Sequence, residues 1–161
     1  NVAVHPAGTA VAATGSTSPR VTAWAWSAGF GTKYADPASV PEDRGEAAWS
    51  PDGAVMVLAI RSSPGAVAYA WSAGFGSRYS APGSFPAGQA RSVTWTADGA
   101  TVFLTTAGTP YVNAYPWSNA TGFGTKYANP STLPAAQAFG VAMTPAAAAA
   151  SARRSLTLLG C

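Results

Sequence analysis

The chain has 161 residues, of which 48% are hydrophobic and only 9% are charged, and its formal net charge is +3. This composition excludes a charge-driven disordered segment, because such segments lack the aromatic and β-branched residues that are plentiful here. The nine basic residues are scattered along the chain, which excludes the charge cluster of a nucleic-acid-binding surface. No apolar stretch reaches the roughly 18 residues of a membrane span, so membrane insertion is not expected.

The first predicted unit covers residues 1–45 and contains four short strands. An apolar strand at 2–4 precedes a His-Pro-Ala-Gly turn, and a second strand follows at 11–14. The third strand ends at Trp26, and the fourth follows a Gly-Phe-Gly loop and carries Lys33 and Tyr34. Proline presets φ for such a turn, and glycine takes the positive φ that a tight hairpin needs.

The second unit, residues 46–90, repeats this order more regularly. Its first strand ends at a Ser-Pro-Asp-Gly turn at 50–53, its second occupies 54–60, and its third ends at Trp71. Arg78 and Tyr79 occupy the fourth strand, after a second Gly-Phe-Gly loop. The unit therefore predicts the same four strands as the first.

The third unit, residues 91–137, again has a turn ending in Asp-Gly, strands at 101–106 and 111–117, and a basic–Tyr pair, Lys126-Tyr127. The apolar start of a further unit follows, so residues 138–161 are predicted to be a partial fourth blade or a C-terminal tail. Its alanine-rich stretch favours a helix or marks a degenerate end of the repeat.

The three units form a repeat, because Trp26, Trp71 and Trp117 follow one another at intervals of 45 and 46 residues. Four short strands in a repeat of this length are typical of propeller blades. The predicted fold class is therefore all-β, with propeller blades that are four-stranded antiparallel sheets, in three repeats plus a partial fourth.

The Ser-Pro-Asp-Gly turn, the small-residue second strand and the tryptophan that ends the third strand resemble the blades of WD40 proteins, and this resemblance implies a propeller. The chain departs from the WD40 pattern in two respects. Serine rather than aspartate follows each of the three tryptophans, and no Gly-His pair precedes a unit. The Tyr-Pro-Trp-Ser and Gly-Phe-Gly-Thr-Lys-Tyr segments are also similar to uncharacterised repeat proteins of tailed phages and environmental bacteria.

Three units and a fraction fall short of the four to eight blades that close a propeller. Either the chain is a piece of a longer one, or several copies assemble, most simply as a dimer that supplies about six blades. The expected partners are therefore other protein chains, above all copies of this one.

The residues that carry chemistry are few. His5 is the only histidine and lies in a turn, so a turn role is favoured over that of a catalytic base. Glu42, Asp43 and Glu46 are close in sequence, where a solvated loop is favoured over a paired-carboxylate or calcium site. The single cysteine, Cys161, provides no metal-ligand spacing. The sequence therefore predicts no metal, no cofactor and no enzyme activity.

The leading functional hypothesis is a non-catalytic structural or interaction module, extracellular or part of a virion or surface assembly. The alternative is a lectin-like propeller that binds a glycan through one aromatic loop per blade, although blade packing can use the same aromatic rings. The candidate binding residues are the repeated aromatic and basic–Tyr positions: Trp26, Phe30, Lys33, Tyr34, Trp71, Phe75, Arg78, Tyr79, Trp117, Phe123, Lys126 and Tyr127.

Overall fold

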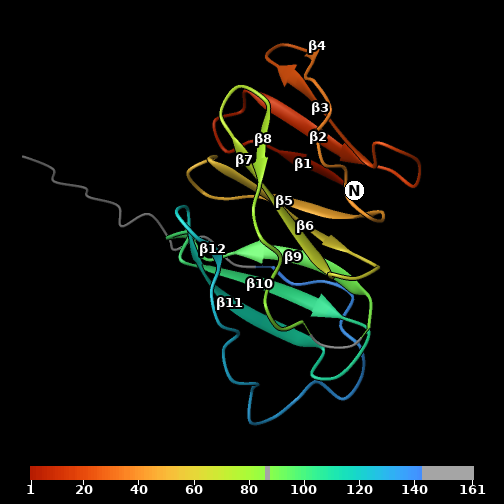
Figure 1. The fold of residues 1–161 in the computed structure, drawn as a ribbon, viewed down its shortest axis with the longest axis vertical. Helices are drawn as coiled ribbons and strands as arrows, with labels where there is room; N and C mark the ends of the chain where they lie inside the picture. The colour runs from red at the N-terminus through yellow and green to blue at the C-terminus, as the bar shows by residue number, and fades with distance from the viewer. Residues whose placement is uncertain (86–87, 143–161) are drawn as a thin grey trace, which may run out of the picture.

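The computed structural model describes residues 1–85 and 88–142, and over these ranges it consists of strands and their connections. Twelve strands form three four-stranded antiparallel sheets that lie one above another in Figure 1. Each sheet contains four consecutive strands, and each strand pairs with its neighbour in sequence. The predicted all-β fold class with four-stranded blades is confirmed. Within the described residues there is no helix of the length and apolarity needed to cross a membrane.

The strand boundaries follow the repeat. The first sheet contains β1 (Val2–Val4), β2 (Ala10–Thr14), β3 (Val21–Trp26) and β4 (Phe30–Lys33). The second contains β5 (Gly45–Trp49), β6 (Val55–Ile60), β7 (Ala66–Trp71) and β8 (Phe75–Arg78). The third contains β9 (Ala90–Trp95), β10 (Thr101–Thr106), β11 (Val112–Ser118) and β12 (Gly122–Phe123).

The turn between the first two strands of each sheet depends on a glycine with positive φ. Gly8, Gly53 and Gly99 have φ values of 67°, 72° and 70°, a region that glycine enters without the steric penalty of a Cβ. In the second sheet the hydroxyl of Ser50 accepts a hydrogen bond from the backbone N–H of Val55 at 2.9 Å. The Thr96 hydroxyl does the same for Thr101 at 3.0 Å. The turn therefore closes in the same way in both sheets.

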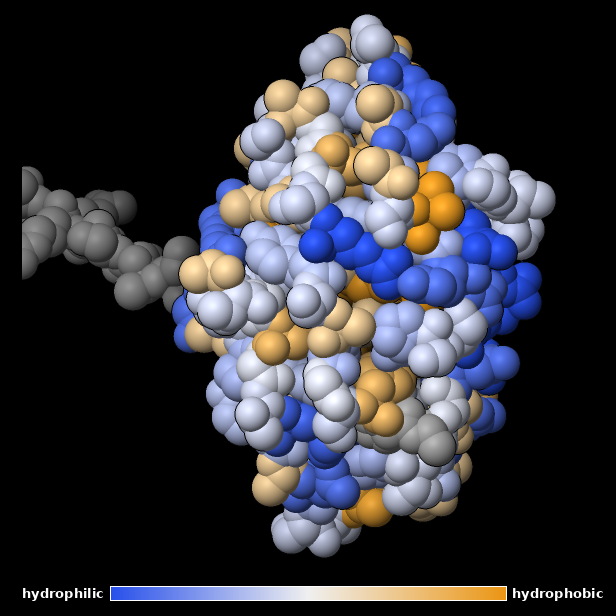
Figure 2. Space-filling model, in the orientation of Figure 1, coloured by the Kyte–Doolittle hydropathy of each residue, from blue (hydrophilic) through white to orange (hydrophobic). Residues whose placement is uncertain are grey.

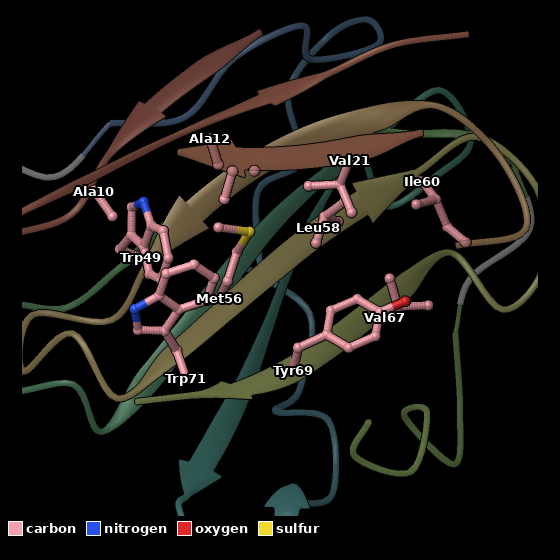
Figure 3. Close-up of a cluster of buried hydrophobic side chains, with 12 residues drawn as sticks. Ala10, Ala12, Val21, Trp49, Met56, Leu58, Ile60, Val67, Tyr69 and Trp71 are labelled. Carbon is pink, nitrogen blue, oxygen red and sulfur yellow. The ribbon is translucent and has the colours of Figure 1, made fainter. Parts of the chain in front are cut away.

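Apolar side chains on facing sheets fill the spaces between them. The first cluster joins Ala10, Ala12 and Val21 of the first sheet to the side chains of the second. Figure 3 shows Val21 beside Leu58, and the rings of Trp49 and Trp71 next to each other. The two indoles meet edge to face, with centroids 4.5 Å apart. This arrangement suits the ring quadrupoles.

A second cluster fills the space between the second and third sheets. It includes Val55, Val57, Trp95, Leu104 and Tyr115. Every residue of β6 is buried, because its side chains alternate between the two clusters. The middle sheet is thus covered on both faces.

The first strands of the three sheets, β1, β5 and β9, lie next to one another. β5 contacts both β1 and β9, so the three sheets fan out from a shared inner edge with β4, β8 and β12 outermost. This radial order is that of propeller blades. The predicted unit boundaries stay predictions. Residues 138–142 contain no strand, and the rest of the predicted fourth unit lies outside the described residues.

Candidate functional site

A cavity of about 300 Å³ lies at the inner edge of the sheets. Its walls come from the starts of β1, β5 and β9 and from the residues that follow β2 and β6. These strand ends lie on the right-hand side of Figure 1, and hydrophilic residues gather along the same side in Figure 2. The cavity is therefore a polar site at one end of the shared inner edge, to which all three sheets contribute.

Backbone contacts fix the rim of this cavity. The Thr14 hydroxyl donates a hydrogen bond to the carbonyl oxygen of Gly45 at 2.6 Å, which joins the first sheet to the second. The side-chain oxygen of Asn1 accepts a hydrogen bond from the Ala47 N–H at 3.0 Å. A Cβ at Gly45 would overlap the carbonyl of Ala59 on the neighbouring strand, so only glycine allows β5 to pair this closely with β6 at the rim.

Three arginines line the cavity: Arg44, Arg61 and Arg91. The ion pairs among the described residues join Lys33 to Asp36 and Arg78 to Glu42, so none of them neutralises a cavity arginine. The Nε of Arg91 is buried without a hydrogen-bond partner in the described structure. Guanidinium groups present several N–H donors in a fork that matches carboxylate and phosphate oxygens. The cavity therefore offers a site for an anion.

Glu46 is the carboxylate of this cavity. It is the second residue of β5 and pairs with Ala59 in the β5–β6 ladder, so the sheet determines its position. It is half-buried and takes part in no ion pair within the described residues. A carboxylate that lines a polar cavity can accept a proton from a water molecule bound there.

The acidic residues expected in one solvated loop have three different surroundings. Glu42 forms an ion pair of 2.6 Å with Arg78, and Asp43 accepts a hydrogen bond from the backbone of Arg44 at 2.7 Å. Only Glu46 faces the cavity. No group of three or more histidine, cysteine, aspartate or glutamate residues that could hold a metal ion occurs among the residues that the structure describes.

The tryptophan and phenylalanine of each predicted aromatic set lie between the sheets in the second and third units and at the surface in the first. Trp71 is 7% exposed and packs against Tyr34 and Phe75. The equivalent set in the third sheet is Trp117 with Tyr79 and Phe123, whose rings lie 5.0 Å from the indole. Trp26 and Phe30 instead are exposed by 38% and 71%.

The predicted basic residues lie on the outer strands or just after them, away from the cavity. Lys33 pairs with Asp36, and Arg78 with Glu42. The ammonium of Lys126 donates to the side chain of Asn129, and the neighbouring ring of Tyr127 is 49% exposed. The structure thus joins the aromatic positions into packing clusters and leaves the basic positions apart from one another.

Two buried tyrosines attach the sheets to the connections between them. The Tyr69 hydroxyl donates to the Ser39 carbonyl at 2.6 Å, and the Tyr115 hydroxyl to the Ser84 carbonyl at 2.9 Å. Burial raises the pKa of Tyr69 to about 12, which Arg78 opposes and Glu42 reinforces. Burial also raises the pKa of Tyr115 to about 12. Both hydroxyls therefore stay protonated as structural donors at neutral pH.

Sequence reasoning missed the cavity, because its arginines come from separate parts of the chain and were counted only as scattered charge. One signal was available. Ala90 and Arg91 begin the inner strand of the third sheet as Gly45 and Glu46 begin that of the second. Glu46 and Arg91 are thus charged residues at the second position of two otherwise uncharged inner strands, and this position lies at the end of the sheets where the cavity is found.

The chain is similar to a solved structure from Bacteroides uniformis that carries the name 6-phosphogluconolactonase. The TM-score is 0.58 and the sequence identity 14%, over 76% of this chain and 38% of that one. This chain therefore spans well under half the length of the protein that it matches. No protein-family model matches the chain, and no curated protein does. A likeness at this identity shows the fold, which is propeller-like.

The comparison contradicts two predictions from the sequence. The chain was predicted to be a non-catalytic structural, interaction or glycan-binding module, and it was predicted not to be an enzyme. The structural neighbour carries the name of an enzyme that acts on a lactone, so both predictions are corrected. The physical reason that local motifs were insufficient lies in the fold: the polar groups that line the cavity come from three sheets, and an inventory of local motifs does not bring them together.

Proposed function

We propose that this chain carries the substrate site of a propeller hydrolase that opens the lactone ring of a phosphorylated sugar acid. The observation that carries the proposal is the cavity at the inner edge, where Arg44, Arg61 and Arg91 accompany one carboxylate, Glu46. The name of the structural neighbour supports the substrate class, since a 6-phosphogluconolactone is a phosphate monoester and a cyclic ester at once.

The arginines have the chemistry to bind both parts of such a substrate. Phosphate oxygens accept paired N–H bonds from a guanidinium, and such charge-assisted bonds are about twice as strong as neutral ones. A second guanidinium can donate to the lactone carbonyl, whose oxygen gains negative charge during attack. With three arginines and one glutamate, the cavity keeps an excess of positive charge for an anionic substrate.

Glu46 has the chemistry to activate water. Its carboxylate takes a proton from a water molecule while the water oxygen bonds to the lactone carbonyl carbon. The ring C–O bond then breaks, and the leaving oxygen takes up a proton to become a hydroxyl group. One water is consumed, and the product is a hydroxy acid that ionises to a second anion in the cavity.

Lactone opening releases acid, so a pH-indicator assay tests the proposal. Glu46→Gln is expected to lower kcat by roughly 100-fold or more, the usual contribution of a general base. Arg61→Ala is expected to lower kcat/KM by roughly 10- to 100-fold, because a charged hydrogen bond is lost. The loss should be smaller with the unphosphorylated lactone.

Arg78→Ala is the matched control, since Arg78 pairs with Glu42 outside the cavity and its loss should leave the rate unchanged. Opening no faster than the spontaneous reaction would contradict the proposal. Equal rates for the parent protein and Glu46→Gln would contradict the role of Glu46.

We also propose that the units are WD40-like blades. The Ser-Pro-Asp-Gly turn supports this finer relationship. The Ser50 hydroxyl bonds to the N–H of Val55, and the Asp52 carboxylate accepts the N–H of Ala54 at 3.0 Å. Hydrogen bonding, above all from Ser50, holds the pKa of Asp52 below its usual value. The turn is thus stabilised by the charged carboxylate.

A further inference from the structure

Arg91 of the cavity occupies a position at which the second sheet has no side chain. Counted back from the tryptophan that ends each inner strand, Arg91 of the third sheet corresponds to Gly45 of the second. A Cβ at Gly45 would overlap the carbonyl of Ala59, so the regular ladder of the second sheet leaves no room for a side chain there. The third sheet therefore needs a different ladder to carry an arginine at this position.

The ladder between β9 and β10 is irregular at this residue. The neighbours of Arg91 in β9, Ala90 and Ser92, pair with the adjacent residues Thr106 and Thr105 of β10. Two steps along β9 thus correspond to one step along β10, which leaves Arg91 as the extra residue of a β-bulge. Such bulges redirect a side chain and are frequent next to active sites. The bulge therefore accommodates an arginine that lines the cavity.

The ring of Phe139 reaches the guanidinium of Arg91 from another part of the chain. The Cζ of Arg91 lies 5.8 Å from the centroid of this ring, within the roughly 6 Å of a cation–π contact. Phe139 follows β12, is 65% exposed and belongs to neither of the two apolar clusters between the sheets. The contact with Arg91 is therefore the role that the described structure gives to this aromatic ring.

An aromatic face and a carboxylate hold an arginine with different consequences. A carboxylate accepts N–H bonds from the guanidinium and cancels its charge, whereas an aromatic face attracts the charge and occupies none of the N–H donors. The ion pairs among the described residues do not include Arg91, and its Nε is buried there without a hydrogen-bond partner. The guanidinium is thus held while its charge and its donors stay available to an anion.

We infer that Arg91 is a phosphate contact of the cavity and that Phe139 is its positioning residue. The inference rests on the proposed function for the anion that binds, and it adds the residue that holds a guanidinium in place for it. The β-bulge fixes the backbone of Arg91, and the ring of Phe139 restricts its side chain before the phosphate arrives. Preorganised donors bind more tightly, because less side-chain freedom is lost on binding.

Calorimetric titration with inorganic phosphate tests the inference without any turnover. Phe139→Ala and Phe139→Leu are expected to weaken phosphate binding about two- to fivefold, the usual effect of an exposed cation–π contact. Phe139→Tyr keeps an aromatic face and should bind as the parent does. Arg91→Ala should weaken binding roughly tenfold or more, because charged hydrogen bonds are lost. Leu133→Ala is the matched control, since Leu133 is an exposed apolar residue of the same segment, and it should keep the parent affinity.

A positioning role predicts that the effect of Phe139 disappears with the arginine. Phe139→Ala in the Arg91→Ala background is expected to change the phosphate affinity no further, and circular dichroism would check that each variant is folded. The inference is overturned if the parent binds no phosphate, if Phe139→Leu binds as tightly as the parent, or if the losses from the two alanine substitutions add. Phosphate binding with the expected dependence on Phe139 supports the inference even where the lactone is not opened, so a failure of the proposed function stays distinguishable.

Discussion

At the scale of single residues, equivalent glycines in the hairpin turns have the same backbone conformation but differ in how much space a Cβ would have. Gly8 and Gly53 have nearly equal φ values of 67° and 72°. A Cβ at Gly8 would meet nothing within 4 Å, whereas one at Gly53 would overlap the ring of His5. That ring donates from Nε2 to the Gly53 carbonyl at 3.1 Å and packs on Trp49. His5 is therefore a contact between the first two sheets.

The substitution Gly53→Ala is expected to destabilise the protein more than Gly8→Ala. Both place a Cβ in the left-handed region, which costs roughly 1–2 kcal/mol, but only Gly53→Ala also displaces His5. The free energy of unfolding from urea titrations would measure the difference. In the background of His5→Ala the two substitutions should cost the same amount. An equal cost in the presence of His5 would show that its ring moves aside without loss.

At the scale of the elements, the aromatic contacts show how one sheet recognises the next. Tyr34 follows β4 and touches Trp71 at the end of β7, so the outermost part of one sheet lies on the third strand of its neighbour. The same geometry recurs between Tyr79 and Trp117. The repeated sequence thus determines the contact between neighbouring sheets as well as the strands within each sheet.

A double-mutant cycle on Tyr34→Ala and Trp71→Phe is expected to give a coupling free energy of roughly 0.5–1.5 kcal/mol, typical of an edge-to-face pair. The control cycle combines Tyr34→Ala with Trp117→Phe, which belongs to the other interface. Those two changes should be additive, since distant sites without shared partners are independent. Chemical denaturation of the single and double variants provides the measurement. If the changes in the free energy of unfolding were additive in the first cycle, the contact between the Tyr34 and Trp71 rings would contribute no specific stability.

At the scale of the whole molecule, the sequence allowed the sheets to be predicted more fully than the site. The Asp-Gly turns and the regularly spaced tryptophans indicate where strands begin and end from nearby residues alone. Because these features recur in successive units, the strands of one unit support the assignment in the next. The cavity depends on where the sheets lie relative to one another. Arg61 follows β6, Arg91 is the second residue of β9, and Glu46 lies on β5. These residues come together because the three sheets stack around a shared inner edge. Their spacing along the sequence does not indicate this proximity.

The same stacking explains why the aromatic positions gave an ambiguous signal. Trp71 and Trp26 occupy the same place in their units, yet one is 7% exposed and the other 38%. The difference comes from the neighbouring sheet, so the residue type alone could not separate a packing role from a binding role.

The burial of β6 on both faces has a consequence for the dynamics of the chain. All six of its residues are inaccessible to solvent, and it forms ladders with both β5 and β7. Its amide protons can therefore exchange with deuterium only when the ladders with β5 and β7 open and water reaches the strand, whereas β1 pairs with one strand only and is half open to water. Hydrogen exchange followed by mass spectrometry should find the slowest amides in β6 and the fastest strand amides in β1. The middle sheet would then be the cooperative unit whose opening limits the lifetime of the folded state.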